Sequence, residues 1–204
     1  MKLNRTSNRR QAFTLIELLA VIAIIGILFT LVSPQIGKAR LRAKLTQQAA
    51  KARYIVEAIT AKEAANRFSQ GWPQSEPGDD FYGTSTEFFV DLVNGGYLDV
   101  EFSFFAGPGM TPARNESEFT AENNAWCVVL DVNDTTRGNT PVVYMKNLNI
   151  GELSFAENAV PLGNKGFAFA TKNGEAVSVQ QAEMNDHGTF SAIFGTNSVS
   201  RLEP

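Results

Sequence analysis

Residues 13–32 of the 204-residue chain read FTLIELLAVIAIIGILFTLV. Its twenty residues include one charged side chain, Glu17. At about 1.5 Å per residue, a helix of this length measures about 30 Å, which matches the thickness of the hydrocarbon core of a bilayer. The stretch therefore predicts a membrane-spanning helix near the start of the chain.

Charge is distributed very unevenly, although the whole chain carries only −3. Residues 1–12 carry +4, residues 38–72 carry +6 and residues 73–204 carry −12. Together with the apolar run, this pattern predicts four segments. They are a basic leader (1–12), an apolar helix (13–34), an amphipathic basic stem helix (35–70) and an acidic globular head (71–204).

A secretory signal peptide is the alternative interpretation of the first segments. Such peptides combine a basic start with an apolar core of about 7–15 residues. The apolar run here is longer, and the sequence SPQIG at residues 33–37 offers no clear small-x-small cleavage site after it. Both features disfavour simple secretion.

Glu17 is the unusual residue of the apolar run. A carboxylate within a membrane span is unfavourable by about 2.5–3.5 kcal/mol even on lenient scales. Either Glu17 lies near the membrane end and reaches water, or it has a positive partner. Cleavage between Ala12 and Phe13 would create an α-amine four residues before Glu17, in the same chain or in a neighbouring copy.

The stretch from Ala12 to Leu28 resembles the class III signal of type IV pilins and the related pseudopilins. A basic leader, Phe13 after the cut, Glu17 at the fifth mature position and an uncharged run all match this family. Gly26 and Pro34 fall where type IV pilins carry residues that loosen the helix. The family usually has Gly before the cut, where this chain has Ala12, which is also small.

This resemblance implies a function for each matched residue. A prepilin peptidase would cut after Ala12 and methylate the amine of Phe13. Glu17 would pair with Phe13 of an adjacent subunit and set the register of a growing filament. Gly26 and Pro34 lower helix stability, so the helix could kink or melt between them; an ordinary kink at the membrane exit is the alternative for Pro34.

The stem is expected to be a helix that continues to Phe68 and ends near Gly71-Trp72-Pro73. Its apolar or small residues recur mostly at spacings of three and four, which predicts a helix packed on the head by one face. They are Leu41, Leu45, Ala49, Ala52, Ile55, Val56, Ile59, Ala65 and Phe68.

Four bases, Lys38, Arg40, Arg42 and Lys44, follow the apolar run. Because the leader carries a similar charge, the positive-inside rule does not decide the orientation. The family resemblance implies a cytoplasmic leader and a periplasmic head. The four bases would contact either lipid head groups or acidic heads of neighbouring subunits.

The head is expected to form an antiparallel β-sheet that covers the stem helix, in an α+β, pilin-like fold. Asn173-Gly174 between two apolar runs is a strong hairpin signal. We expect a short helix at 84–94 and strands at 126–132, 141–148, 166–171 and 175–180.

Residues typical of catalytic and metal sites are few. Cys127 is the only cysteine, which excludes an internal disulfide, and His187 is the only histidine. Asp131, Asn133 and Asp134 could supply oxygen ligands to calcium, or could form a polar turn. The resemblance adds that several major pseudopilins bind calcium in their acidic heads. We therefore expect no enzyme, no other cofactor, and no direct contact with nucleic acid by the acidic head.

The resemblance leaves two branches of the family open. Many type IV pilins close a C-terminal loop with a disulfide, which one cysteine cannot form. The stretch LVNGGYL at residues 92–98 and the closing hairpin resemble pseudopilins of type II secretion systems. A pseudopilin is thus the first expectation, with itself, other pseudopilins, prepilin peptidase and the inner-membrane assembly platform as partners. A type IV pilus subunit is the second, and a membrane-anchored or secreted enzyme the third.

Overall fold

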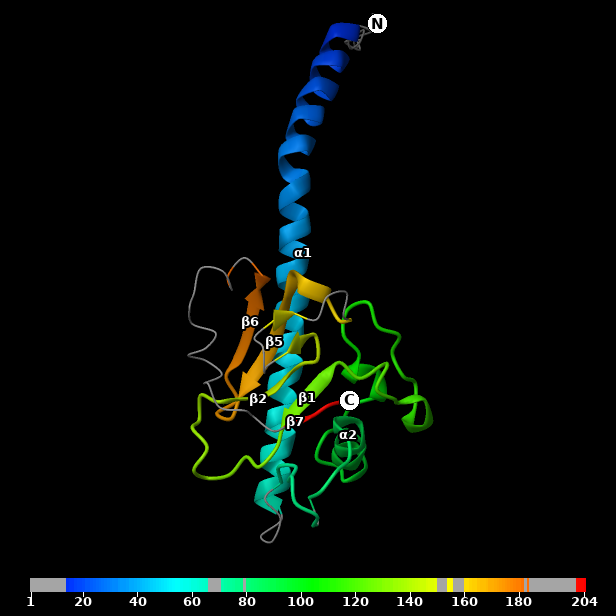
Figure 1. The fold of residues 1–204 in the computed structure, drawn as a ribbon. Coiled ribbons are helices and arrows are strands. Elements are labelled where there is room, and N and C mark those ends of the chain that lie inside the picture. Colours follow the sequence, from blue (N-terminus) through cyan, green and yellow to red (C-terminus); the bar gives the residue numbers. More distant parts are fainter. Residues whose placement is uncertain are drawn as a thin grey trace, which may run out of the picture. The chain divides into compact units, whose positions relative to one another are not determined.

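The computed structural model describes residues 14–65, 71–78, 80–149, 154–155, 160–181, 183 and 201–204. The chain divides into two compact units, Met1–Arg40 and Leu41–Pro204. Helix α1 (Leu15–Ala65) runs from the first unit into the second, and the other described elements belong to the second unit (Figure 1). The expected helical residues 66–68 lie outside the described residues.

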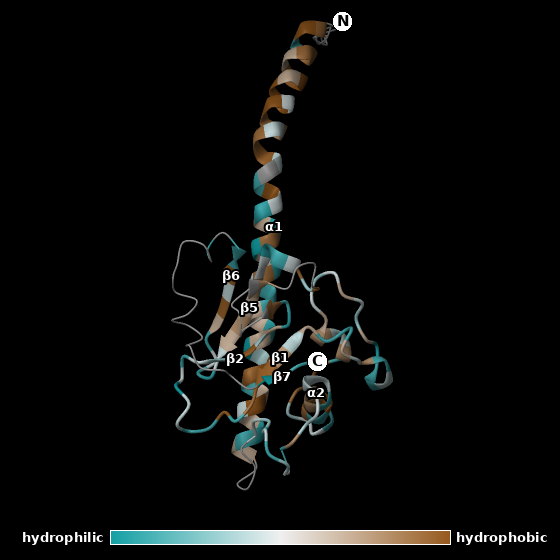
Figure 2. Cartoon of the chain, viewed as in Figure 1, coloured by the Kyte–Doolittle hydropathy of each residue, from teal (hydrophilic) through white to brown (hydrophobic). Residues whose placement is uncertain are grey.

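Residues 15–32 of α1 are apolar apart from Glu17, and the helix is unbroken. The helix is continuous through Gly26 and Pro34, and Figure 2 shows its first turns in the colours of hydrophobic residues. By length and hydropathy, α1 qualifies as a candidate membrane span. The expected helix is therefore present, and its two weakest helix formers do not interrupt it.

The part of α1 in the second unit buries one face against the head. The expected stripe is confirmed in its middle, where one to two residues of every turn are buried. Ala65, at the end of the helix, is exposed. The buried members are Leu45, Ala49, Ala52, Ile55, Val56 and Ile59.

The head contains a five-stranded sheet with the order β6-β5-β2-β1-β7, in which every neighbouring pair is antiparallel. Thr171 and Glu175 close the β5–β6 hairpin, and Gly174 adopts a φ of 78° that favours glycine. The α+β, pilin-like fold is thus confirmed. The strands are β1 (Trp126–Val129), β2 (Pro141–Met145), β5 (Gly166–Thr171), β6 (Ala176–Gln180) and β7 (Arg201–Leu202).

Two strands are shorter than expected. The strand predicted at 126–132 ends at Val129, and Asp131 beyond it has a φ of 58° that is incompatible with a strand. The strand predicted at 141–148 ends at Met145. Leu148–Asn149 instead forms β3, which pairs with β4 (Ser154–Phe155) in a separate two-stranded sheet.

Helix α2 (Ser85–Asn94) lies beside the sheet and confirms the helix expected at 84–94. The hydroxyl of Thr84 caps its start by accepting a hydrogen bond from the Glu87 N–H. Its end is a Schellman motif, in which the Tyr97 N–H donates to Leu92 O and Gly96 adopts a φ of 74°. The described residues include three short 3₁₀ helices, η1 (Phe102–Phe105), η2 (Glu116–Glu118) and η3 (Gly163–Lys165).

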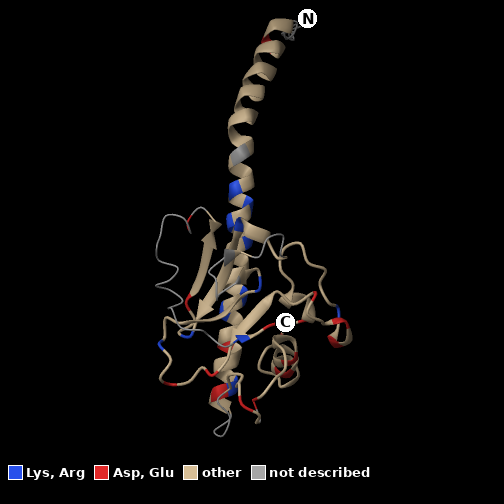
Figure 3. Cartoon of the chain, in the orientation of Figure 1, with Lys and Arg blue, Asp and Glu red and all other residues tan. Residues whose placement is uncertain are grey.

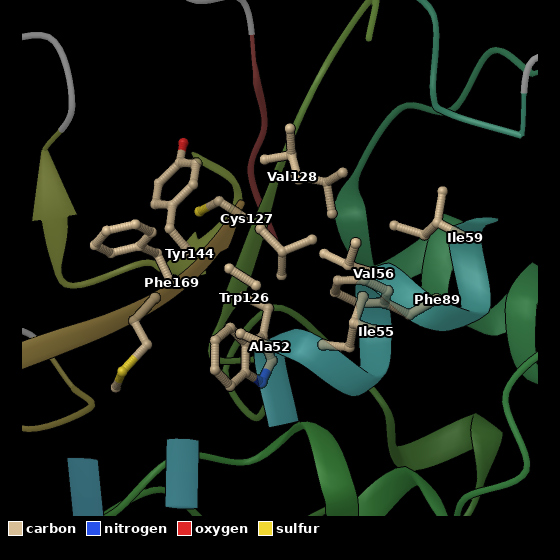
Figure 4. Packing of buried hydrophobic residues seen from close by; sticks show 14 of the residues in the cluster. Ala52, Ile55, Val56, Ile59, Phe89, Trp126, Cys127, Val128, Tyr144 and Phe169 are labelled. Carbon is tan, nitrogen blue, oxygen red and sulfur yellow. The ribbon is translucent and has the colours of Figure 1, made fainter. Parts of the chain in front are cut away.

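The core of the second unit lies where α1, α2 and the sheet meet. Figure 4 shows Ala52, Ile55 and Val56 of α1 beside Trp126 of β1 and Phe89 of α2. All five side chains are at most 1% exposed. The apolar stripe of the stem therefore forms one wall of the core of the head.

Candidate functional site

The start of α1 is a capping box built from Thr14 and Glu17. The Thr14 hydroxyl accepts a hydrogen bond from the Glu17 N–H at 3.3 Å. In return, Glu17 Oε2 accepts bonds from the N–H and the hydroxyl of Thr14, each at 2.8 Å. This reciprocal arrangement satisfies the first free N–H groups of the helix and places a negative charge at its positive end.

Glu17 therefore has partners in its own chain, which the sequence analysis missed. The signal was available, because Thr14-x-x-Glu17 before an apolar run is the sequence signature of a capping box. Ala12 and Phe13, the expected cleavage and methylation residues, lie outside the described residues. In sequence, Phe13 directly precedes Thr14, so cleavage after Ala12 would place the new amine next to the cap.

The apolar side chains after Glu17 have no partner within the described residues. They point outward all around the helix, with exposed fractions from 69% at Phe29 to 47% at Val21. A continuous apolar surface of this size in a protein marks a membrane or protein contact. Gly26 has nothing within 4 Å of the position its Cβ would take, so the surface is also open there.

The four bases that follow, Lys38, Arg40, Arg42 and Lys44, are all exposed. None of them forms an ion pair with any of the residues that the structure describes. Figure 3 shows their blue segment on α1, next to the tan apolar part. This charge is available to an external partner.

The candidate calcium ligands lie in a turn in which most polar groups are already bonded. The Asp131 carboxylate accepts bonds from the N–H and the hydroxyl of Ser75, at 2.9 and 2.7 Å. Asn133 Oδ1 accepts bonds from the N–H and the hydroxyl of Thr135. Among the described residues, no three His, Cys, Asp or Glu side chains cluster in a way that could hold a metal ion.

The side-chain ammonium of Lys172 bonds to the backbone of this turn. Lys172 Nζ donates to the backbone oxygens of Asn133 and Thr136. A lysine ammonium at these carbonyls supplies positive charge to the turn from the β5–β6 hairpin. The side chains of Asp131 and Asn133 are thus bonded within the protein, and the calcium site stays a prediction.

Cys127 is buried in β1, as its apolar sequence context predicts. Burial raises the pKa of its thiol to about 12, so the reactive thiolate is scarce at neutral pH. In Figure 4, Cys127 lies near Tyr144 of β2. His187 lies outside the described residues.

A charge cluster around the buried ammonium of Lys62 joins α1 to the head. Lys62 Nζ lies 2.8 Å from Asp91 Oδ2, 3.3 Å from Asp80 Oδ1 and 2.7 Å from the Tyr82 hydroxyl. The same ammonium lies over the rings of Tyr82 and Phe88. Burial disfavours the charged ammonium, but hydrogen bonds to Asp91 and Tyr82 outweigh it and raise the pKa of Lys62. Local sequence patterns do not indicate this cluster, because its members are far apart in the chain.

Comparisons with known proteins identify the N-terminal segment. Residues 7–33 match the model of the prokaryotic N-terminal methylation motif. No curated protein matches the chain, and no solved structure matches it either. The matched residues include Ala12, Phe13, the capping box and most of the apolar run. The chain therefore carries an N-terminal methylation motif, consistent with a prepilin-type cleavage signal, on an α+β, pilin-like fold.

Proposed function

We propose that this protein is a pseudopilin, a structural subunit of the short periplasmic filament of a type II secretion system. The observation that carries the proposal is the N-terminal methylation motif at residues 7–33, which leads directly into an exposed apolar helix. The subunit is first anchored in the inner membrane, with its leader in the cytoplasm and its head in the periplasm. It then enters the filament through α1.

Processing prepares the subunit for assembly. Prepilin peptidase cuts after Ala12 and methylates the amine of Phe13, which keeps its positive charge. Glu17 of one subunit then pairs with Phe13 of the next. An unpaired charge among packed apolar helices is strongly unfavourable, so one matched register is preferred over slipped ones.

The capping box gives Glu17 a partner before assembly. Its carboxylate is bonded to Thr14 in the isolated chain, which reduces the cost of holding a charge at the membrane boundary. For Glu17 to pair with a neighbouring subunit, the new partner must bind its carboxylate more strongly than the N–H and hydroxyl of Thr14 do. A cationic amine meets this requirement, because charge-assisted hydrogen bonds are roughly twice as strong as neutral ones.

Three features support a pseudopilin over a subunit of a type IV pilus. The only cysteine, Cys127, is buried in β1, so no disulfide closes the C-terminal part of this chain. Residues 92–98 form the end of α2 and its Schellman turn, the stretch that resembles pseudopilins. The β5–β6 hairpin supplies the expected closing strands.

Two experiments test the proposal at different levels. Glu17→Ala should abolish incorporation into filaments purified from cells, while Glu57→Ala, an equal charge change on exposed α1 surface, should leave assembly intact. Normal, fully incorporated Glu17→Ala fibres would contradict the filament role. Deletion of the gene should block secretion of folded proteins across the outer membrane; loss of surface pili with normal secretion would instead identify a type IV pilus subunit.

A further inference from the structure

The head carries a groove that the core does not fill. It has a volume of about 580 Å³ and lies between the segment that leads into η1 and the loop that leads into η2. Half-buried Val100 and Phe102 contribute to its walls, together with Pro112 and Ala113. The groove thus offers apolar surface at a solvent-open position.

The surroundings of this groove are acidic. Glu101 and Glu116 line it, with Arg114 as the only basic residue among its lining residues. Asp99 and Glu118 are exposed next to them in the sequence. None of these four acids forms an ion pair with a described residue.

The bonds that these carboxylates do make are to neutral groups. Glu116 Oε2 accepts from the Asn94 amide at 3.2 Å, and Glu118 Oε2 accepts from the Arg114 backbone N–H at 3.1 Å. Glu101 Oε2 accepts from the Ser103 hydroxyl at 3.5 Å. Their negative charge is therefore left uncompensated by the fold.

The same chain carries an uncompensated positive segment. Residues 38–44 hold four exposed bases and no acid, and none of the four is ion-paired within the described part of the chain. The other bases of α1 do find partners: Arg53 pairs with Glu57, and Lys62 with Asp80 and Asp91. Lys51 forms no ion pair with a described residue, but its ammonium donates to the backbone oxygens of Phe104 and Ala106. Among the described bases of α1, the lack of any bonded partner is thus specific to this segment.

We propose that the groove between residues 100–103 and 111–116 receives the basic segment 38–44 of a second copy of this chain. The inference rests on the proposed filament function and names the surfaces through which heads and stems meet. A Lys or Arg stem can lie on the apolar walls while its charged end reaches the acidic rim. Charge complementarity across the contact would also select the register between copies.

Disulfide crosslinking tests this contact directly, because buried Cys127 gives little background reaction. Arg42→Cys combined with Glu101→Cys should give a ladder of crosslinked multimers in filaments assembled in cells. The matched control combines Arg42→Cys with Asp134→Cys, an exposed acid in the turn after β1, and should give no ladder. A ladder of equal strength in both pairs, or in neither, would overturn the proposal.

Charge exchange provides the second test. Arg40→Glu with Arg42→Glu should reduce filament yield at least tenfold, and so should Glu101→Arg with Glu116→Arg. Combining all four substitutions should restore a large part of the yield. If the basic segment served only to bind lipid head groups, the acidic-side variants would assemble normally and the combination would rescue nothing.

Failure of the groove proposal can be distinguished from failure of the proposed filament function. If the unsubstituted chain forms filaments that require Glu17, but no charge exchange is rescued, the groove proposal fails and the proposed function stands. If the unsubstituted chain forms no filament, the proposed function fails. Circular dichroism and thermal unfolding of each purified full-length variant establish that it is folded.

Discussion

Lys62 Nζ lies 2.8 Å from Oδ2 of Asp91, so the last turn of α1 is bonded to α2. Asp80, only 8% exposed at its side chain, approaches the same ammonium from the loop before α2. The ammonium of Lys62 thus connects three segments of the chain: the end of α1, the loop before α2, and α2 itself. This cluster adds polar bonds between the stem helix and the head to the apolar packing of the core.

Lys62→Met should destabilise the head strongly, because two carboxylates would lose their shared cation. Breaking a buried ion pair by removing one partner is unfavourable by about 3–5 kcal/mol, and about 3 kcal/mol is expected here. Arg53→Met is the matched control, since the Arg53–Glu57 pair on the same helix is 60% and 50% exposed. It should change stability by about 0.5 kcal/mol or less.

Denaturant unfolding of the full chain in detergent measures this difference. The fluorescence of the two tryptophans, Trp72 and Trp126, reports on the head because both are buried. Equal losses in the Lys62 and Arg53 variants would contradict the structural importance of the cluster.

Asp91 should make the head sensitive to acid. Burial alone would raise its pKa, but hydrogen bonds from Lys62 and Tyr82 outweigh burial and lower it. A carboxyl whose pKa is lowered in the folded state stabilises the fold above its unfolded value of about 3.9 and loses that contribution as the pH falls. Lys62, with a raised pKa, contributes fully at neutral pH and loses its contribution only in strong alkali.

The unfolding free energy should therefore fall more steeply in the parent than in Asp91→Asn between about pH 5 and 3, because there the Asp91 carboxyl of the unfolded chain takes up a proton more readily than that of the folded chain. At pH 7 the variant should already be the less stable of the two. If the unfolding free energies of the two proteins changed with pH in parallel, protonation of Asp91 would not be coupled to folding.

Truncation of an isoleucine should affect the stability of the head in one part of α1 and filament yield in the other. Ile55 is 0% exposed in the core of the head, whereas Ile27 is 63% exposed. Ile55→Ala should lower the unfolding free energy of the head by about 2–5 kcal/mol. Ile27→Ala should leave it unchanged and reduce filament yield instead. Loss of head stability in the Ile27 variant would contradict the division of roles along the helix.

Asp131 should act through Ser75 rather than through a metal. Asp131→Asn weakens two charge-assisted hydrogen bonds and should lower the unfolding free energy by about 1–2 kcal/mol. The loss should be the same in calcium and in a chelator. A calcium-dependent rise in the melting temperature of the parent, absent in the variant, would instead support a calcium site.

Sequence patterns predicted those elements that are determined by local spacing. The apolar run and the three- and four-residue spacing from Leu45 to Ile59 predicted both parts of α1, and Asn173-Gly174 predicted the β5–β6 hairpin. These signals work because helix and hairpin geometry repeat over a few residues.

Features built from distant residues could not be predicted in this way. Lys62 and Asp91 are 29 positions apart, and their contact exists only once the loop between them has folded. β7 has two residues and is defined entirely by its pairing with Val128 and Val129. The capping box of Thr14 and Glu17 is different, because its signature is local and was readable in the sequence.

Mass spectrometry of the N-terminal peptide from filaments assembled in cells tests the proposed processing and assembly. We predict a mature chain that begins with N-methylated Phe13 and lacks residues 1–12. A chain that retains its first twelve residues in working filaments would contradict it, and so would a soluble head that begins beyond Ser33.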